Sequence, residues 1–130
     1  MPISYTLYNH VNLVVSIARG ETAGIEYLEY YSRLYSDPLF TPGSNELIDI
    51  RQAELKDVGP DLLREVAKLT ADINKGLPTK SAIVTSDKLQ FGVSRAYAAY
   101  SSLHADEESR PFRTLSEAFA WLEVEEFPIE

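Results

Sequence analysis

The chain has 130 residues, 45% of them hydrophobic, a formal net charge of −8 at pH 7 and no cysteine. This length and apolar content predict a single globular domain over residues 1–130. The lack of cysteine excludes disulfides, thiolate metal ligands and a cysteine nucleophile, and is typical of a cytoplasmic protein. The negative charge argues against nucleic acid as a partner, and no apolar stretch is long enough for membrane insertion.

Two strands are predicted at the N-terminus. Residues 3–8 and 11–18 alternate between apolar and polar positions, which is the period of a half-buried strand. Asn9 and His10 lie between them and predict a two-residue hairpin loop, because Asn tolerates a positive φ. One apolar face on each strand indicates that helices cover mainly one side of the sheet.

Residues 19–22 predict a turn, with Thr22 as the N-cap of a helix that runs to about Ser36. Apolar and tyrosine side chains cover about 220° of this helix, a wider surface than packing on a sheet requires. Two interpretations remain open. The tyrosine rings could pack on the sheet with their hydroxyls in water, or the extra width, including Tyr27 and Tyr30, could contact a partner protein or a second copy.

The central strand is predicted at residues 46–50, which form a short and mostly apolar run. Residues 55–61 are not expected to continue it. Pro60 suits the first position of a helix, and apolar residues recur at helical spacing from there to about residue 75. This segment therefore predicts a strand, a turn and a helix that buries one side.

The rest of the chain continues to alternate between strands and helices. Thr114 and Glu117 have the spacing of a capping box, in which each side chain bonds a backbone N–H of the other. The order is β-β-α-β-α-β-α-β-α, which predicts an α/β fold with a five-stranded mixed sheet and helices mainly on one face. The remaining segments are a strand at 81–85, a helix at 87–103 capped by Ser86 and Asp87, a polar loop at 104–110, a strand at 111–113 and a helix from 114 to about 122.

Four segments resemble the STAS/SEC14-like (SpoIIAA-like) small proteins of bacteria. They begin at Phe40 (Phe-Thr-Pro-Gly), Leu47 (Leu-Ile-Asp-Ile-Arg-Gln-Ala), Phe91 (Phe-Gly-Val-Ser-Arg-Ala-Tyr) and Phe112 (Phe-Arg-Thr-Leu-Ser-Glu-Ala-Phe-Ala-Trp-Leu). The resemblance covers nearly the whole chain. It implies a sheet with helices packed mainly on one face, and it implies no established reaction.

The resemblance also implies where a regulatory serine would lie. Anti-sigma-factor antagonists of this fold carry a phosphorylated serine in an Asp-Ser-Ser-Gly-like turn before the helix that follows the central strand. The matching turn here is Asp57-Val58-Gly59-Pro60, which contains no hydroxyl. A phosphoserine switch at this turn is therefore not expected.

A candidate binding site is predicted at the carboxyl end of the central strand. Asp49, Arg51 and Asp57 are expected there, and Ser86 follows the next strand. Ligands of open parallel sheets bind at this edge, and Arg51 could hold an anion or a partner's carboxylate. Alternatively, these residues form a structural network in which Asp57 caps the helix and Arg51 pairs with an acid.

No catalytic residues, cofactor or metal site are predicted. Ser94 lies in a Gly-Val-Ser-Arg-Ala segment, but a nucleophile elbow needs a strand directly before the serine, and here a helix has already begun. His10 and His104 are far apart in sequence and neither has a second ligand at metal-binding spacing.

Two functions are compatible with these observations. The first is a non-enzymatic STAS-like regulatory or interaction module that binds a protein partner and self-associates as a homodimer. Its contact surface would be the tyrosine-rich helix or the mixed face of the sheet. The alternative is a binding protein or enzyme for a small or apolar molecule, which would use Asp49, Arg51, Asp57 and Ser86.

Overall fold

The computed structural model describes residues 2–104 and 106–129, which form a five-stranded sheet and four α-helices. The strands lie side by side in chain order; β1 is antiparallel to β2, and all other neighbours are parallel. The predicted α/β fold with a mixed sheet is confirmed. The elements are β1 (Ile3–Tyr8), β2 (Leu13–Ala23), α1 (Gly24–Tyr35), β3 (Asn45–Lys56), α2 (Pro60–Asn74), β4 (Thr79–Val84), α3 (Lys88–His104), β5 (Glu107–Phe112) and α4 (Leu115–Trp121).

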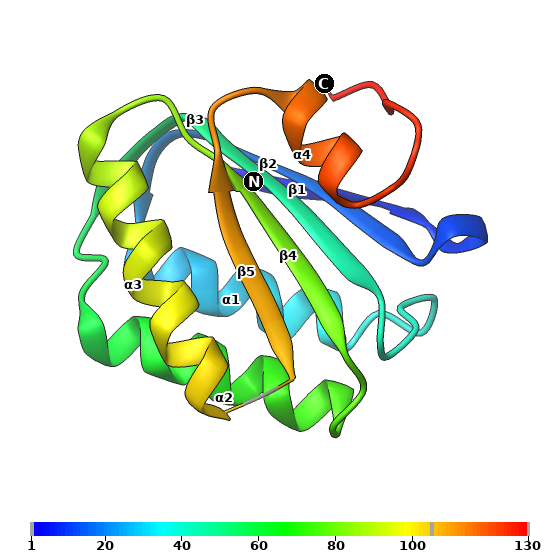
Figure 1. Cartoon of the computed structure of the whole chain (residues 1–130). Helices are drawn as coiled ribbons and strands as arrows, with labels where there is room; N and C mark the ends of the chain where they lie inside the picture. Colours follow the sequence, from blue (N-terminus) through cyan, green and yellow to red (C-terminus); the bar gives the residue numbers. More distant parts are fainter. Residues whose placement is uncertain (1, 105, 130) are drawn as a thin grey trace.

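The helices divide unequally between the two faces of the sheet. The parallel connections all advance in one direction across the sheet, so α1, α2 and α3 cover one face, whereas α4 lies on the other (Figure 1). The larger core, with Tyr30, Ile48 and Val66, lies under α1–α3, and a smaller one, with Leu47 and Phe119, lies under α4. The expectation of helices mainly on one face is confirmed.

The predicted turn at residues 19–22 is wrong, because β2 continues to Ala23. The pairing with β3 shifts register between Ile17 and Arg19, and Gly20 has a φ of +72°. The extra residue at this shift lies on β3, where the partners advance from Asp49 to Gln52. Beyond it, residues 19–23 of β2 pair in regular register with β3, so the turn-forming residues do not end the strand.

Thr22 is not the helix cap that the sequence predicts. Its side chain is fully buried, and its hydroxyl hydrogen-bonds with the Tyr27 hydroxyl at 2.9 Å. Ala23 is the N-cap of α1, and its N–H donates to the Glu26 carboxylate at 3.1 Å. The predicted cap is wrong because β2 extends through Thr22 to Ala23, so that the N-cap of α1 lies one residue later than expected.

Strand β3 is longer than the predicted 46–50. Its second half, from Gln52 to Lys56, pairs with residues 19–23 of the extended β2. Two of its outward positions, Gln52 and Glu54, are exposed and polar, so an apolar pattern does not reveal this half. The strand ends before Asp57, which has a φ of +51°.

Two other segments differ from the predictions. A 3-10 turn at Asn9–Val11, followed by Asn12 with a φ of +52°, connects β1 to β2 in place of a two-residue loop. The predicted loop at 104–110 and short strand at 111–113 are replaced by β5, which starts at Glu107. An edge strand with charged residues at exposed positions has little apolar signal.

The predicted helix starts are largely confirmed. Helix α2 begins at Pro60, and the Asp87 carboxylate accepts the N–H of Gln90 at 2.8 Å in the first turn of α3. Thr114 Oγ1 accepts the N–H of Glu117 at 3.2 Å. The reciprocal half of the capping box differs, because the Glu117 carboxylate accepts the Thr114 hydroxyl instead of its backbone N–H.

Candidate functional site

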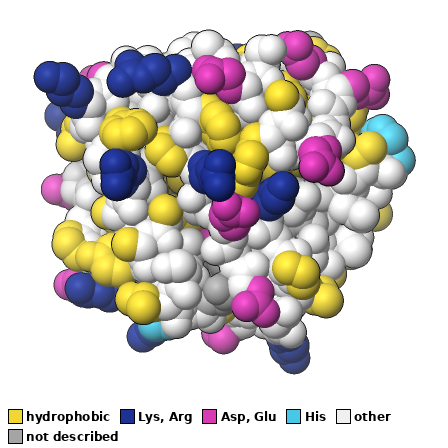
Figure 2. Space-filling model, viewed as in Figure 1, with side chains coloured by type: hydrophobic (Ala, Val, Ile, Leu, Met, Phe, Trp, Pro, Cys, Tyr) yellow, Lys and Arg dark blue, Asp and Glu magenta, His cyan; other side chains and the backbone are white. Residues whose placement is uncertain are grey.

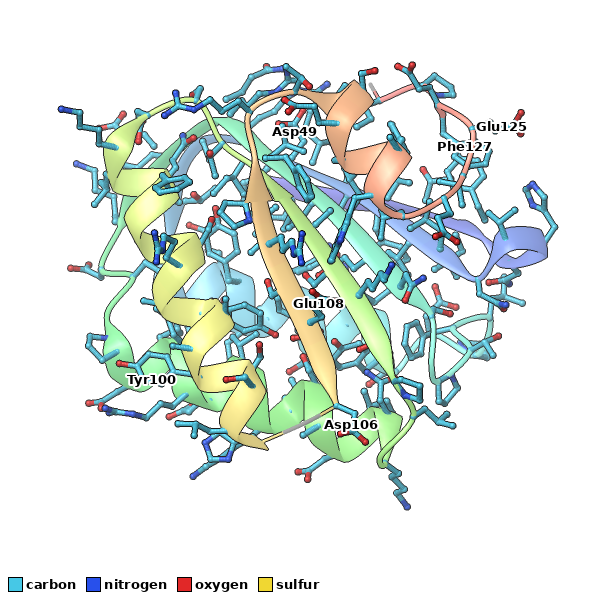
Figure 3. The ribbon with its side chains drawn as sticks, viewed as in Figure 1. Asp49, Tyr100, Asp106, Glu108, Glu125 and Phe127 are labelled. Carbon is cyan, nitrogen blue, oxygen red and sulfur yellow. The ribbon has the colours of Figure 1, made fainter. Side chains whose placement is uncertain are left out.

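Asp49 lies on the α4 side of β3 (Figure 3) and forms an ion pair with Arg51. Asp49 is 1% exposed, and its two oxygens accept Nε of Arg51 at 2.9 Å and Nη2 at 2.8 Å. The main-chain N–H of Arg51 adds a third bond at 3.0 Å. The hydrogen bonds to the carboxylate raise the pKa of Arg51. Such bidentate geometry offsets the cost of burying the carboxylate, which favours the structural interpretation of this pair.

Ser86 joins this pair, as the sequence predicts. Strand β4 ends at Val84, which pairs with Asp49 of β3, and the Ser86 hydroxyl donates to the Arg51 carbonyl at 3.0 Å. The N–H of Ser86 donates to the Gln90 side chain at 2.8 Å. Ser86 thus ties the end of β4 and the start of α3 to β3, which leaves its polar groups engaged within the protein.

Asp57 does not join the other three residues. It follows the end of the extended β3, and the six residue steps from Arg51 to Asp57 correspond to roughly 20 Å of extended chain. Its carbonyl lies against Gly24 at the start of α1, where an added Cβ would be 2.3 Å away. The predicted four-residue site is therefore split between the end of β4 and the end of β3.

Tyr27 and Tyr30 do not form the exposed surface that a partner-binding role requires. They are 9% and 1% exposed, and β2 supplies their hydroxyls with buried partners, Thr22 for Tyr27 and Ser16 for Tyr30. The other interpretation, in which the rings pack on the sheet with their hydroxyls in water, is also wrong in one respect. The rings do pack on the sheet, but these two hydroxyls lie in the core. Burial raises the pKa of both tyrosines.

Glu46 is the main polar group that the sequence interpretation misses. Its carboxylate accepts the hydroxyls of Tyr30 and Tyr31, each at 2.8 Å, on the face of β3 that α1 covers. Burial raises its pKa to about 7, although both phenol bonds act in the opposite direction. The only available signal is the alternation of β3, which puts Glu46 on the same face as Ile48.

A second acid, Glu107, lies near Glu46 across the sheet. It accepts the Tyr97 hydroxyl at 2.8 Å, and burial raises its pKa. Both glutamates line a hollow of about 10 Å³, together with Tyr35 and Thr70. This volume is close to that of one water molecule, so the acids face each other without room for a substrate.

An open apolar groove lies between α2 and α3, at the carboxyl end of β3. It measures about 270 Å³. Leu89, at its rim, is 62% exposed. A Cβ on Gly92 would meet nothing within 4 Å, so this glycine widens the groove. The groove is lined by Val58, Pro60, Leu63, Lys88, Leu89, Gly92, Val93 and Ala96.

A smaller apolar cavity borders this groove on its core side. It measures about 60 Å³ and shares Val58, Leu63 and Val93 with the groove. Its inner walls come from both layers of the core, with Ile48 on the sheet and Tyr31 on α1. Groove and cavity are thus neighbouring apolar spaces that share three wall residues.

The described residues contain no group of three or more His, Cys, Asp or Glu side chains that could hold a metal ion. Over the same residues, no helix is long and apolar enough to cross a membrane. The structure thus offers an open apolar groove as a binding feature and two polar clusters that are satisfied internally.

Neither a protein-family model nor a curated protein matches the chain. Among solved structures, the chain is similar to an uncharacterised protein of the DUF3478 family from Shewanella loihica PV-4, whose fold is described as SpoIIAA-like. The TM-score is 0.60 at 20% identity, and the match covers 92% of this chain and 93% of the other. The chain therefore has a SpoIIAA-like fold, as the resemblance predicts.

Proposed function

We propose that the protein is a SpoIIAA-like interaction module that binds an apolar group of a protein partner in the groove between α2 and α3. The observation that supports this proposal is the open groove itself, with its exposed Leu89 and a mostly apolar lining that adjoins a cavity in the core. Contiguous exposed apolar surface of this kind is typical of interaction sites. This role requires no catalytic residue.

The position of the groove supports the same function. It lies at the carboxyl end of β3 and β4, where ligands of open α/β sheets bind. Its wall includes Val58 and Pro60, from the turn that corresponds to the phosphorylated turn of anti-sigma-factor antagonists. Because residues 57–60 lack a hydroxyl, this protein would bind its partner without phosphorylation at that turn.

Gly92 provides a further argument for a functional groove. A glycine in the middle of a helix costs about 1 kcal/mol relative to alanine. No neighbour occupies the space of its missing Cβ, so packing does not require glycine at this position. An open space above the helix is what an inserted side chain of a partner would need.

Co-purification with matched variants tests this function. Gly92→Leu would fill the groove with a side chain, and Thr6→Leu would add the same side chain at an exposed position of β1, far from the groove. A partner that is captured from the native host by the wild type and by Thr6→Leu, but lost with Gly92→Leu, supports the proposal. Equal capture by all three proteins would refute it.

A small apolar ligand is the second candidate, and the internal cavity favours it. At about 60 Å³ the cavity is smaller than the engineered 150 Å³ cavities that bind benzene, so a ligand would also occupy the groove. A thermal-shift screen of fatty acids and aromatic compounds tests this alternative, since a ligand at 100 times its Kd adds about 2.7 kcal/mol of stability. Stabilisation that Gly92→Leu abolishes would favour the small ligand over a protein partner.

A further inference from the structure

Strand β5 lies at one edge of the sheet. At alternate residues its main-chain N–H and C=O groups point away from β4, towards the free edge. The carbonyls of Asp106 and Phe112 accept N–H groups at the two ends of β4, at 3.1 and 2.8 Å. Main-chain groups point to alternate sides along a strand, so those of Glu107, Ser109 and Pro111 point to the free edge. Within residues 2–104 and 106–129, no strand lies beyond β5 (Figure 1).

The charges of β5 complement those of a second copy in one register. Glu108 and Arg110 are exposed on the α4 side, where Arg110 bonds Glu108 at 2.9 Å and lies over the Trp121 ring. If two β5 strands pair antiparallel about Ser109, each Glu108 lies opposite the Arg110 of the other copy. These are non-hydrogen-bonded positions, where side chains come closest. The result is a network of two acids and two guanidinium groups.

The backbone fits the same register. Ser109 would exchange two hydrogen bonds with its counterpart across the two-fold axis. The N–H of Glu107 would donate to the Pro111 carbonyl of the other copy. Pro111 lacks an N–H and therefore removes only the two outermost bonds of this ladder. Strand β1, at the other edge of the sheet, carries no charged residue and offers no such complementarity.

Ser109 has a further property that this pairing would explain. Among residues 2–104 and 106–129, its hydroxyl is the one buried side-chain polar atom without a hydrogen-bond partner. An unpaired buried hydroxyl costs about 1–3 kcal/mol. In the pairing about Ser109, a rotation about χ1 would bring the two serine hydroxyls together across the strands, a contact that stabilises sheets.

Helix α3 presents an additional surface beside the same edge. Its residues at 90, 94, 97 and 101 are buried against the sheet, and those at 93, 96 and 100 lie towards α2. The stripe of Phe91, Arg95, Ala98 and Ser102 therefore faces away from α2, on the side of β5. Figure 2 shows hydrophobic and basic side chains interspersed on this face.

We propose that the protein forms a symmetric dimer in which β5 pairs antiparallel with β5 of a second copy about Ser109, so that one sheet runs through both subunits. The stripe on α3 then lies against the same helix of the other copy. Isologous pairing of this kind closes after two subunits. The dimer leaves the groove between α2 and α3 open, so it does not depend on the proposed function.

Charge reversal provides the decisive test, with sedimentation velocity over a series of protein concentrations as the measurement. Glu108→Arg and Arg110→Glu each place like charges opposite one another and should raise the dimer dissociation constant about tenfold or more. The double variant with both changes restores the complementary pairs and should dimerise like the wild type. Thr6→Arg on the β1 edge serves as the control that leaves the dimer intact.

The backbone part of the proposal has its own readout. Amide exchange of Ser109 should slow as the protein concentration rises, and Ser109→Pro should abolish the dimer while circular dichroism shows a folded subunit. A wild-type protein that stays monomeric at high micromolar concentration overturns the proposal. A dimer that both single reversals leave unchanged also overturns it.

Discussion

The Tyr31 hydroxyl donates to the Glu46 carboxylate at 2.8 Å, and the two side chains join α1 to β3 inside the larger core. Tyr30 donates to the other oxygen of the same carboxylate at the same distance. The broad tyrosine surface of α1 is thus accounted for by buried acid and hydroxyl groups on the sheet. The tyrosines stabilise the fold by satisfying these groups.

The free energy of unfolding should depend on pH through Glu46. Burial raises the pKa of its carboxyl from 4.5 to about 7, so the folded protein holds this proton more tightly than the unfolded chain does. The stabilisation is therefore complete below pH 4.5 and is lost as the pH rises to about 7, by an amount of the order of 3 kcal/mol. Urea unfolding at a series of pH values measures this loss.

Glu46→Gln isolates this contribution, because the amide is uncharged, its oxygen can accept one of the two phenol hydrogen bonds and its NH2 group can donate to the other phenol oxygen. The variant should lose much of the decline in stability towards neutral pH, while Glu107, whose pKa burial also raises, retains its own part. Glu65→Gln, at an exposed position of α2, is the matched control and should keep the wild-type profile. An unchanged pH profile in Glu46→Gln would contradict this assignment.

The pair of Asp49 and Arg51 should prove structural. Arg51→Met would leave a carboxylate that is 1% exposed without its guanidinium partner, at an expected cost of about 3 kcal/mol. Adding Asp49→Asn to this variant should recover part of the loss, because the buried group is then neutral. Chemical denaturation provides the measurement. If Arg51→Met alone were as stable as the wild type, the structural role would be refuted.

Gly24 should be intolerant of a side chain. A Cβ at this position would lie 2.3 Å from the Asp57 carbonyl, so Gly24→Ala must displace the turn between β3 and α2. We expect a loss of about 1–3 kcal/mol in the free energy of unfolding. Gly92→Ala, where nothing lies within 4 Å, is the matched control and should gain about 0.5–1 kcal/mol. Similar effects of both substitutions would refute the proposed close contact.

Local patterns in the sequence predict the layers of this fold but not the full length of its strands. Apolar alternation identifies the first part of β2 and β3, and Pro60 marks the start of α2 correctly. The second half of each strand pairs mainly with the other, and residues such as Glu54 carry no apolar signal there. These lengths are set by tertiary pairing, which one sequence does not reveal.

The candidate site, too, is only partly predictable from local sequence patterns. The sequence correctly predicts that Ser86 lies near Asp49, because β3 and β4 are adjacent parallel strands and their carboxyl ends meet at the same edge of the sheet. Asp57 is misplaced because β3 continues past Arg51. The Glu46 cluster is missed because its tyrosines lie 15 and 16 residues away in the chain, on a different element. Only the folded arrangement shows that the wide surface of α1 has polar partners inside the core.

The groove between α2 and α3 is the central claim, and site-specific photo-crosslinking tests it most directly. A benzoylphenylalanine residue in place of Leu89 would lie at the rim of the groove, and one in place of Thr6 would lie on the opposite edge of the sheet. In the native host, position 89 should give a discrete crosslinked protein that disappears with Gly92→Leu, and position 6 should not give it. Identical crosslinking from both positions, or a product that survives Gly92→Leu, would contradict the account.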